Sequence, residues 1–215
     1  MVKLRLRTLS ENGVRQAERF LRKSDTVMAQ LVSTYGACPL ARREYRPFDT
    51  LTSSIIGQQL SAKAAGAIKR RISEIVPSPF RPENFLAVDV DVLRKAGLSQ
   101  AKVRYIRELA GRVVDGSLCF DDFKSQSNET VISNLIELPG IGRWTAEMFL
   151  IFGLRRPDVL SLSDAGLQRA AKILYCANKR RNISLERIAE KWTPHRSVAS
   201  WYLWKHLDNV GTSAM

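Results

Sequence analysis

A short turn between two apolar helical patterns, Leu138-Pro139-Gly140-Ile141-Gly142, constrains the fold of this chain more than any other stretch. Four apolar residues recur at helical spacing before it: Val131, Ile132, Leu135 and Ile136. Ser127 or Asn128 is suited to cap that helix. A second apolar pattern runs from Arg143 to Gly153, where glycine can end a helix. The sequence therefore predicts two helices joined by a tight hairpin.

Such a hairpin is suited to binding a phosphate. The first turn of its second helix has backbone N–H groups without helical partners, and these lie at the positive end of the helix dipole. Two glycines also let a phosphodiester backbone approach without a Cβ in the way. The alternative interpretation is an ordinary connector between two core helices, because a short glycine-rich turn is a weak signal on its own.

The charge balance of the chain favours a polyanionic partner. Its 215 residues include 34 Lys and Arg against 21 Asp and Glu, which gives a formal net charge of +13 at pH 7. This surplus favours nucleic acid first and an acidic membrane second, and a basic protein without such a partner is the plain alternative. A hydrophobic content of 45% supports a packed core rather than a disordered chain.

Several features argue against membrane spans, disulfides and metal cofactors. No apolar run approaches the roughly 18 residues of a membrane span. The basic start, residues 1–7, fits a short strand or an extended arm, and no apolar block follows it as in a secretory signal. Cys38, Cys119 and Cys176 are far apart and odd in number, which fits no disulfide framework, zinc site or four-cysteine iron–sulfur cluster and favours a reducing compartment. Two histidines are too few for a His-rich metal site.

Helical periodicity along the rest of the chain predicts an all-α protein. The expected helices are residues 11–22, 25–36, 48–57, 61–72, 99–113, 165–175, 184–191 and 195–208, with short helices around residues 88–95. Expected N-caps are Ser24 or Asp25 and Ser99, and a helix is expected to restart at Ser61. Residues 77–82 are expected to form a loop. The charged side chains of Lys102, Arg104 and Arg107 are expected to form a solvated face of their helix. The basic, proline-containing linker 37–47 predicts a boundary between two lobes.

The stretch from Leu138 to Ala146, followed by Asp164, resembles the helix-hairpin-helix/Gly-Pro-Asp motif of a DNA glycosylase superfamily. Within it the chain is most similar to the alkylation-repair branch, the 3-methyladenine DNA glycosylases II. Two further stretches carry this similarity, residues 55–65 (IIGQQLSAKAA) and residues 192–197 (WTPHRS), the latter leading on to Trp204. The similarity runs from Arg46 to Leu207.

The resemblance implies two helical lobes with a DNA-binding cleft. One lobe would be formed by both chain ends, residues 1–47 with 155–215. The other would be a central lobe, residues 48–154, that ends in the helix-hairpin-helix over residues 128–153. The implied partner is double-stranded DNA with alkylated bases. The protein is expected to act as a monomer and not to bind a membrane. The implied location is the cytoplasm with the nucleoid, or the nucleus of a eukaryote.

The resemblance assigns catalysis to Asp164. A carboxylate can stabilise the oxocarbenium-like sugar that forms as a glycosidic bond breaks, and can orient or deprotonate the attacking water. The plain alternative is that Asp164 or Ser163 only caps the next helix, and the two roles are compatible. Bifunctional relatives have a lysine where Trp144 stands, and its amine forms a Schiff base. Trp144 therefore predicts a hydrolase without lyase activity.

The resemblance also implies a substrate pocket and a DNA-contact surface. Trp144, Met148 and Trp204 match the pocket, where an indole face suits a cationic alkylated purine, although both tryptophans could instead be core residues. One well-known bacterial member has tyrosines at the positions of Met148 and Ala165, which leaves the breadth of substrates open. The implied DNA-binding residues are Gln58, Gln59, Leu60, Ser61, Pro139, Gly140, Ile141, Gly142, Arg143, Thr145 and Arg196, and a wedge that fills the gap of the extruded base is expected among residues 59–61.

The implied cofactor requirement is none, apart from a structural Na⁺ or K⁺ held by the backbone carbonyls of Ile136, Leu138 and Ile141. The predicted function is that of a monofunctional DNA glycosylase of base excision repair, which releases 3-methyladenine and 7-methylguanine and leaves an abasic site. A non-catalytic helix-hairpin-helix DNA-binding module is the main alternative. A bifunctional glycosylase/lyase and a basic all-α RNA-binding protein are two others, and Trp144 argues against the first of these.

Overall fold

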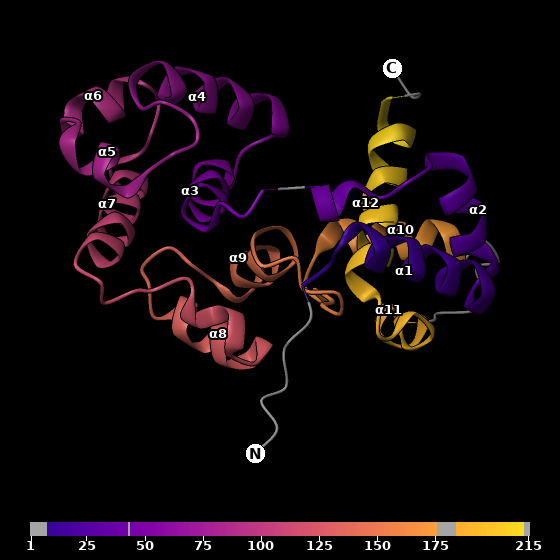
Figure 1. Ribbon diagram of the computed structural model, residues 1–215. Helices are drawn as coiled ribbons and strands as arrows, with labels where there is room; N and C mark the ends of the chain where they lie inside the picture. Colours follow the sequence, from indigo (N-terminus) through magenta and orange to yellow (C-terminus); the bar gives the residue numbers. More distant parts are fainter. Residues whose placement is uncertain (1–7, 43, 176–183, 213–215) are drawn as a thin grey trace. The chain divides into compact units, whose positions relative to one another are not determined.

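A computed structural model describes residues 8–42, 44–175 and 184–212 (Figure 1). All regular elements in these ranges are helices, which confirms the predicted all-α class. None of the described helices has the length and apolar character to cross a membrane. The predicted arm at residues 1–7 and Cys176 lie outside the described residues. The chain divides into two compact units, the central unit Tyr45–Phe149 and the terminal unit made of the two segments Arg7–Glu44 and Leu150–Met215.

The central unit is built around one long helix. Its elements in chain order are α3 (Pro47–Gly57), α4 (Ala62–Ile75), α5 (Pro82–Ala87), α6 (Val90–Lys95), α7 (Gln100–Val114), the 3₁₀ turn η2 (Asp122–Ser125), α8 (Asn128–Ile136) and α9 (Arg143–Met148). Helix α7 packs against α3, α5 and α6, while α3 also contacts α4 and α9, and α8 packs on α9. The core includes the fully buried Leu51, Ile55, Phe85, Leu93 and Ile106.

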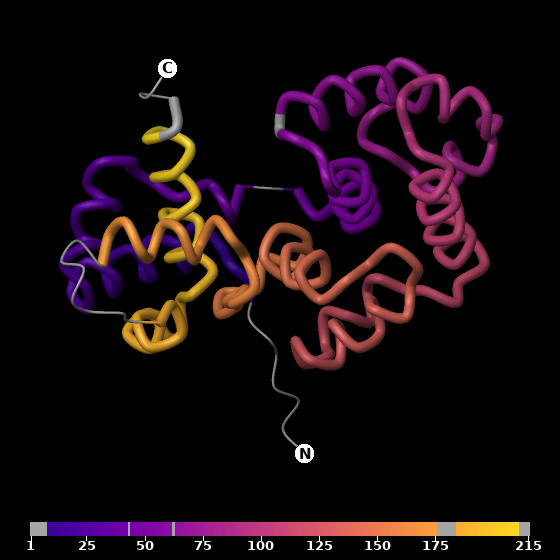
Figure 2. The backbone as a smooth tube through the Cα atoms, turned by 180° about the vertical axis from the view of Figure 1, so that it is seen from behind, coloured from indigo at the N-terminus to yellow at the C-terminus, as the bar shows by residue number. Residues whose placement is uncertain are grey.

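The terminal unit joins the two ends of the chain. It contains α1 (Glu11–Ser24), α2 (Thr26–Tyr35), the 3₁₀ turn η1 (Pro39–Arg42), α10 (Ala165–Tyr175), α11 (Leu185–Ala189), the 3₁₀ turn η4 (Glu190–Trp192) and α12 (Arg196–Thr212). Helix α12 packs against α1, α2 and α10, and its contact with α10 can be followed in Figure 2. Trp192 and Tyr202 are the largest fully buried side chains. Burial of such rings favours the association of the two segments.

The predicted N-caps are confirmed and two of the open choices are settled. Asp25, rather than Ser24, caps α2 by accepting hydrogen bonds from the N–H groups of Val27 and Met28. Ser127, rather than Asn128, caps α8 with its hydroxyl 3.1 Å from the N–H of Thr130. Ser61 and Ser99 cap α4 and α7 in the same way. These polar side chains therefore place four helix starts along the chain.

Two expectations about the central unit are wrong. A helix begins at Pro82, inside the predicted loop, because a proline at the first helical position loses no hydrogen bond and has a suitable φ. Asp89 then caps the short helix α6, so the first of the two short helices, α5, lies entirely before the expected start at Val88. The charged face of α7 is also not simply solvated. Lys102 and Arg107 donate to backbone carbonyls of neighbouring segments, and of the three charged residues Arg104 alone is exposed.

Candidate active site

Asp164 sits at the start of helix α10 in the terminal unit. Its Oδ1 accepts a hydrogen bond of 2.7 Å from the N–H of Leu167, and its carbonyl accepts one of 3.0 Å from Gln168. Asp164 is therefore the N-cap of α10, as the sequence predicts. The residue is only 7% exposed. Capping fixes the carboxylate in one orientation, which is also what a catalytic group requires.

Trp204 of helix α12 makes a second contact to the same carboxylate oxygen. Its indole Nε1–H donates to Asp164 Oδ1 over 3.0 Å. Gly166 makes room for this approach, because a Cβ at that position would lie 3.0 Å from Oδ1 and 3.3 Å from Trp204 Cδ1. The indole ring also packs on Phe152, with 5.6 Å between the ring centroids. Two N–H donors from two helices thus hold the one oxygen.

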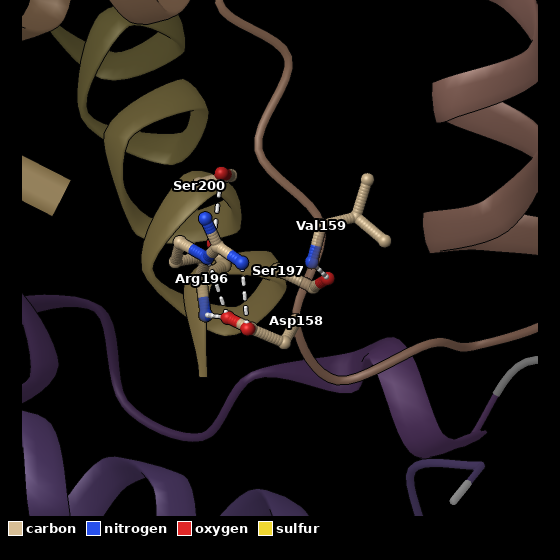
Figure 3. A network of polar contacts seen from close by, with 5 residues as sticks. All are labelled: Asp158, Val159, Arg196, Ser197 and Ser200. Carbon is tan, nitrogen blue, oxygen red and sulfur yellow. Dashed lines mark hydrogen bonds and ion pairs between the residues drawn. The ribbon is translucent and has the colours of Figure 1, made fainter. Parts of the chain in front are cut away.

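The segment that leads to Asp164 is tied to the start of α12 (Figure 3). The guanidinium of Arg196 donates from Nε and one terminal nitrogen to the two carboxylate oxygens of Asp158, over 2.6 and 2.7 Å. The hydroxyl of Ser197 accepts from the N–H of Val159 over 3.0 Å. The Asp158 carboxylate raises the pKa of Arg196. This bidentate pair gives Arg196 a structural role, while its predicted contact to phosphate stays a prediction.

The hairpin turn lies in the central unit, between α8 and α9. Gly140 has a φ of +82°, and a Cβ there would overlap the ring of Tyr105. A side chain at this position would thus be both strained and blocked. Gly142 is the N-cap of α9 and is exposed, with open space where its Cβ would be. The two positions therefore need glycine for different reasons. Gly140 is required by the fold, and Gly142 leaves the start of α9 accessible.

The turn borders a hollow of about 560 Å³. Its lining contains nine residues, eight of them with predicted roles: Gln58, Ile136, Glu137, Leu138, Pro139, Gly140, Ile141, Gly142 and Thr145. The structure thus brings most of the predicted DNA-binding residues together with the three whose carbonyls are predicted to hold a cation. Neutral carbonyl oxygens are suitable ligands for Na⁺ or K⁺, and a monovalent cation at these three carbonyls stays a prediction. Among the described side chains, no group of three or more His, Cys, Asp or Glu could form a metal site.

The chain matches over residues 52–195 the family described as HhH-GPD superfamily base excision DNA repair protein. It belongs to this family. DNA-3-methyladenine glycosylase 1 of Schizosaccharomyces pombe is 32% identical over 163 residues, 74% of this chain and 72% of the relative.

Two solved structures of this HhH-GPD family have a similar fold and substantial identity. The DNA-3-methyladenine glycosidase of Bacillus halodurans is 38% identical, with a TM-score of 0.73 and 88% of each chain covered. The 3-methyladenine DNA glycosylase of Schizosaccharomyces pombe, solved in complex with abasic DNA, is 31% identical, with a TM-score of 0.74 over 88% of this chain and 95% of that one. The helix-hairpin-helix resemblance inferred from the sequence is thereby confirmed.

The predicted pocket residues of this HhH-GPD chain fall in both units. Trp144 lies on α9 in the central unit and is 41% exposed, whereas Met148, one turn later, is buried. Trp204 is partly exposed in the terminal unit. Arg143 forms ion pairs with Glu129, over 2.8 Å, and Glu147, over 3.1 Å. The exposed indole of Trp144 is not a core side chain.

The loop between α3 and α4 contains the three wedge candidates. Gln59, Leu60 and Ser61 are all exposed, and Gln59 has a φ of +58°. Ser61 uses its hydroxyl to cap α4. Gln58 differs from these three residues because it connects the loop to the hairpin turn. Its side-chain amide donates to the carbonyl of Gly140 over 2.7 Å. The identity of the wedge stays a prediction, with Gln59 and Leu60 as the side chains that serve no cap.

Sequence patterns do not reveal several residues that the structure places at Asp164 or along the segment that leads to it. Gly166 and Asp158 lie in a cap region and a loop, where glycine and aspartate are ordinary. A glycine two residues after a candidate catalytic aspartate, inside a helix, is the one available signal of a close approach. The hydrogen bond from Trp204 joins residues 40 apart in sequence. Only the packing of α12 on α10 brings them together.

Proposed function

We propose that this protein is a monofunctional DNA glycosylase of base excision repair, which releases alkylated purines such as 3-methyladenine and 7-methylguanine from double-stranded DNA. The observation that carries the proposal is the carboxylate of Asp164, oriented by the N–H of Leu167 and the indole of Trp204. The relatives named above, which are DNA-3-methyladenine glycosylases, support the substrate class.

The chemistry follows from the substrate. An alkylated purine carries a positive charge, so when the N-glycosidic bond breaks, the bonding electron pair leaves with the base, which becomes neutral. The positive charge then develops on the sugar at C1′. A nearby fixed carboxylate stabilises this charge, and it can accept the proton of the water whose oxygen attacks C1′. The products are a free base and an abasic site.

The absence of a lyase step rests on Trp144. An indole has no amine that could form a Schiff base with C1′, and the resemblance places this residue where bifunctional relatives have their lysine. The exposed face of Trp144 and the partly exposed indole of Trp204 offer electron-rich surfaces for a cationic base. We propose a monomer that requires no cofactor, apart from a structural monovalent cation at the hairpin.

The test is base release from methylated duplex DNA by the wild type and by Asp164→Asn. Asparagine keeps the shape of the side chain and an oxygen that can accept the cap hydrogen bond, so the fold should persist. The expected loss of base release is on the order of 10²-fold or more, because a charge is removed from the transition state. Binding to the same DNA should persist.

A matched control is Asp89→Asn, which alters the N-cap of α6 in the central unit and should leave base release unchanged. Strand cleavage at the abasic product, assayed without alkali, should be absent in the wild type. Wild-type DNA binding without base release would contradict the proposal and favour a non-catalytic binding module. Strand cleavage by the wild type would contradict its monofunctional part.

A further inference from the structure

We propose that Lys102 is a positioning residue for the 58–61 loop, the segment Gln58-Gln59-Leu60-Ser61 between α3 and α4. The inference rests on the proposed function and on the wedge that the resemblance places among residues 59–61 of this loop. Lys102 lies on α7, away from the loop in sequence, and its ammonium binds the end of α3. It acts on the DNA only through the loop that it holds.

The contacts of Lys102 are two short hydrogen bonds to backbone. Its Nζ donates to the carbonyl of Ile56 over 2.8 Å and to the carbonyl of Gln58 over 2.7 Å. The last carbonyls of a helix have no partner within the helix, and they form the negative end of its dipole. An ammonium group at this place satisfies two of these carbonyls and neutralises the charge. The chain then leaves α3 in a defined direction and turns back at Gln59, which has a φ of +58°.

The same support extends to the hairpin turn. The side chain of Gln58, whose carbonyl Lys102 holds, donates to the carbonyl of Gly140 over 2.7 Å, although the two residues are 82 positions apart. Tyr105, one turn after Lys102 on α7, lies against Gly140 at the place where a Cβ would be. Helix α7 therefore supports both the 58–61 loop and the turn. The two segments form one connected surface within the central unit.

The environment of Lys102 indicates that its ammonium group has a structural role and is not simply a solvated surface charge. The side chain is partly buried, and this burial lowers the pKa of Lys102. The two carbonyl groups replace the water that the ammonium loses. Its place in the helix agrees, because Lys102 precedes the buried Ile106 by four residues and so lies beside the inward face of α7.

A supported loop matters because extruding a base is costly. Unstacking and unpairing cost a few kcal/mol, and a side chain that fills the gap offsets more of this cost when it is already held in place. Gln59 and Leu60 are exposed at the tip of the loop and follow directly after the residue whose carbonyl Lys102 binds. Removing the ammonium should therefore impair base extrusion from a paired duplex and spare the later hydrolysis.

The experiment compares Lys102→Met, which keeps most of the side-chain length, with Lys102→Arg, which keeps the donors. Base release is measured on one lesion placed opposite a normal base and on the same lesion opposite an abasic analogue, where extrusion costs less. We expect Lys102→Met to slow release from the paired duplex about tenfold. This factor corresponds to the loss of one strong hydrogen-bonding group. Release from the unpaired lesion should change less than about twofold, and Lys102→Arg should restore the paired rate.

Lys95→Met, on the exposed side of α6, controls for the loss of one positive charge in DNA binding. Extrusion itself is followed in the Asp164→Asn background by the fluorescence of 2-aminopurine beside the lesion, which needs no catalysis. An equal loss on both substrates, or none on either, would overturn the inference. If the wild type released no base, the proposed function would fail, while an extrusion signal that still depended on Lys102 would uphold its positioning role. If the Asp164→Asn protein with Lys102 intact extrudes no base, and the wild type releases none, both the proposed function and the inference are wrong.

Discussion

The indole of Trp204 has two properties that can be separated by substitution. Its ring offers a stacking surface, and its N–H donates to Asp164 Oδ1 over 3.0 Å. Sequence comparison suggests only the first property, because an aromatic residue at a pocket position is expected to stack. The hydrogen bond adds that Trp204 orients the carboxylate. Phenylalanine keeps an aromatic ring and removes the donor, so the two properties can be tested apart.

We expect Trp204→Phe to lower kcat for base release about tenfold or more, since a hydrogen bond to a charged group contributes about 1.5–3 kcal/mol. KM and DNA affinity should change little, because the ring remains. Single-turnover kinetics on methylated duplex DNA would measure this split. The control is Trp201→Phe on the same helix, whose ring packs on Tyr202. An unchanged kcat in Trp204→Phe would show that the hydrogen bond has no part in catalysis.

At the scale of elements, the hairpin depends on two glycines for different reasons. Gly140 has a left-handed φ and is covered by Tyr105, whereas Gly142 has a φ of −92° and open space around it. Alanine at Gly140 would strain the turn and push the Tyr105 ring. Alanine at Gly142 would fit the free protein and would place a methyl group only where a ligand approaches.

Gly140→Ala should therefore reduce the free energy of unfolding by about 1–3 kcal/mol, as expected for a strained backbone position. Gly142→Ala should reduce this free energy by less, at most about 1 kcal/mol, because alanine is a poorer N-cap than glycine, and should still weaken binding to duplex DNA. Urea denaturation and a DNA titration at one fixed salt concentration would measure both effects. If Gly142→Ala binds DNA as tightly as the wild type, the start of α9 does not approach the phosphates closely.

At the scale of the whole molecule, His195 links stability to pH. Its ring packs edge-on against Phe20, its Nδ1 is buried, and no hydrogen-bond partner for that nitrogen lies within the described residues. Burial lowers the pKa of His195, and the Asp158 carboxylate opposes this shift in part. The unfolded chain, with a histidine pKa of about 6.5, therefore binds more protons than the folded one as the pH falls.

This difference means that the contribution of His195 to stability is present above pH ~6.5 and is lost as the pH falls from there toward the lower pKa of the folded state. We expect the free energy of unfolding to decrease from pH 7.5 to pH 5, and this decrease to be shallower in His195→Phe. Denaturant titrations at several pH values would measure the slope, which does not depend on how much the substitution itself destabilises. An identical slope in the variant would rule out His195 as the cause.

Local sequence patterns were sufficient for most of the helices and many of their boundaries. Serine and aspartate caps mark helix starts because their side chains bond to the next N–H groups, and this chemistry involves only neighbours in sequence. Pro82 shows the limit of such patterns. A proline is equally compatible with a loop and with the first position of a helix. The packing of α5 on α7 decides between the two conformations.

The sequence by itself determined the all-α class, the hairpin, the basic charge and the family, because these follow from periodicity, composition and short motifs. Only the tertiary structure decided what Lys102, Gln58 and Gly166 do. Each of them acts on a partner distant in sequence: a helix end, a turn and an indole ring. Hydrogen bonds and close approaches of this kind depend on how helices pack in three dimensions, and no local pattern in a single sequence records that packing.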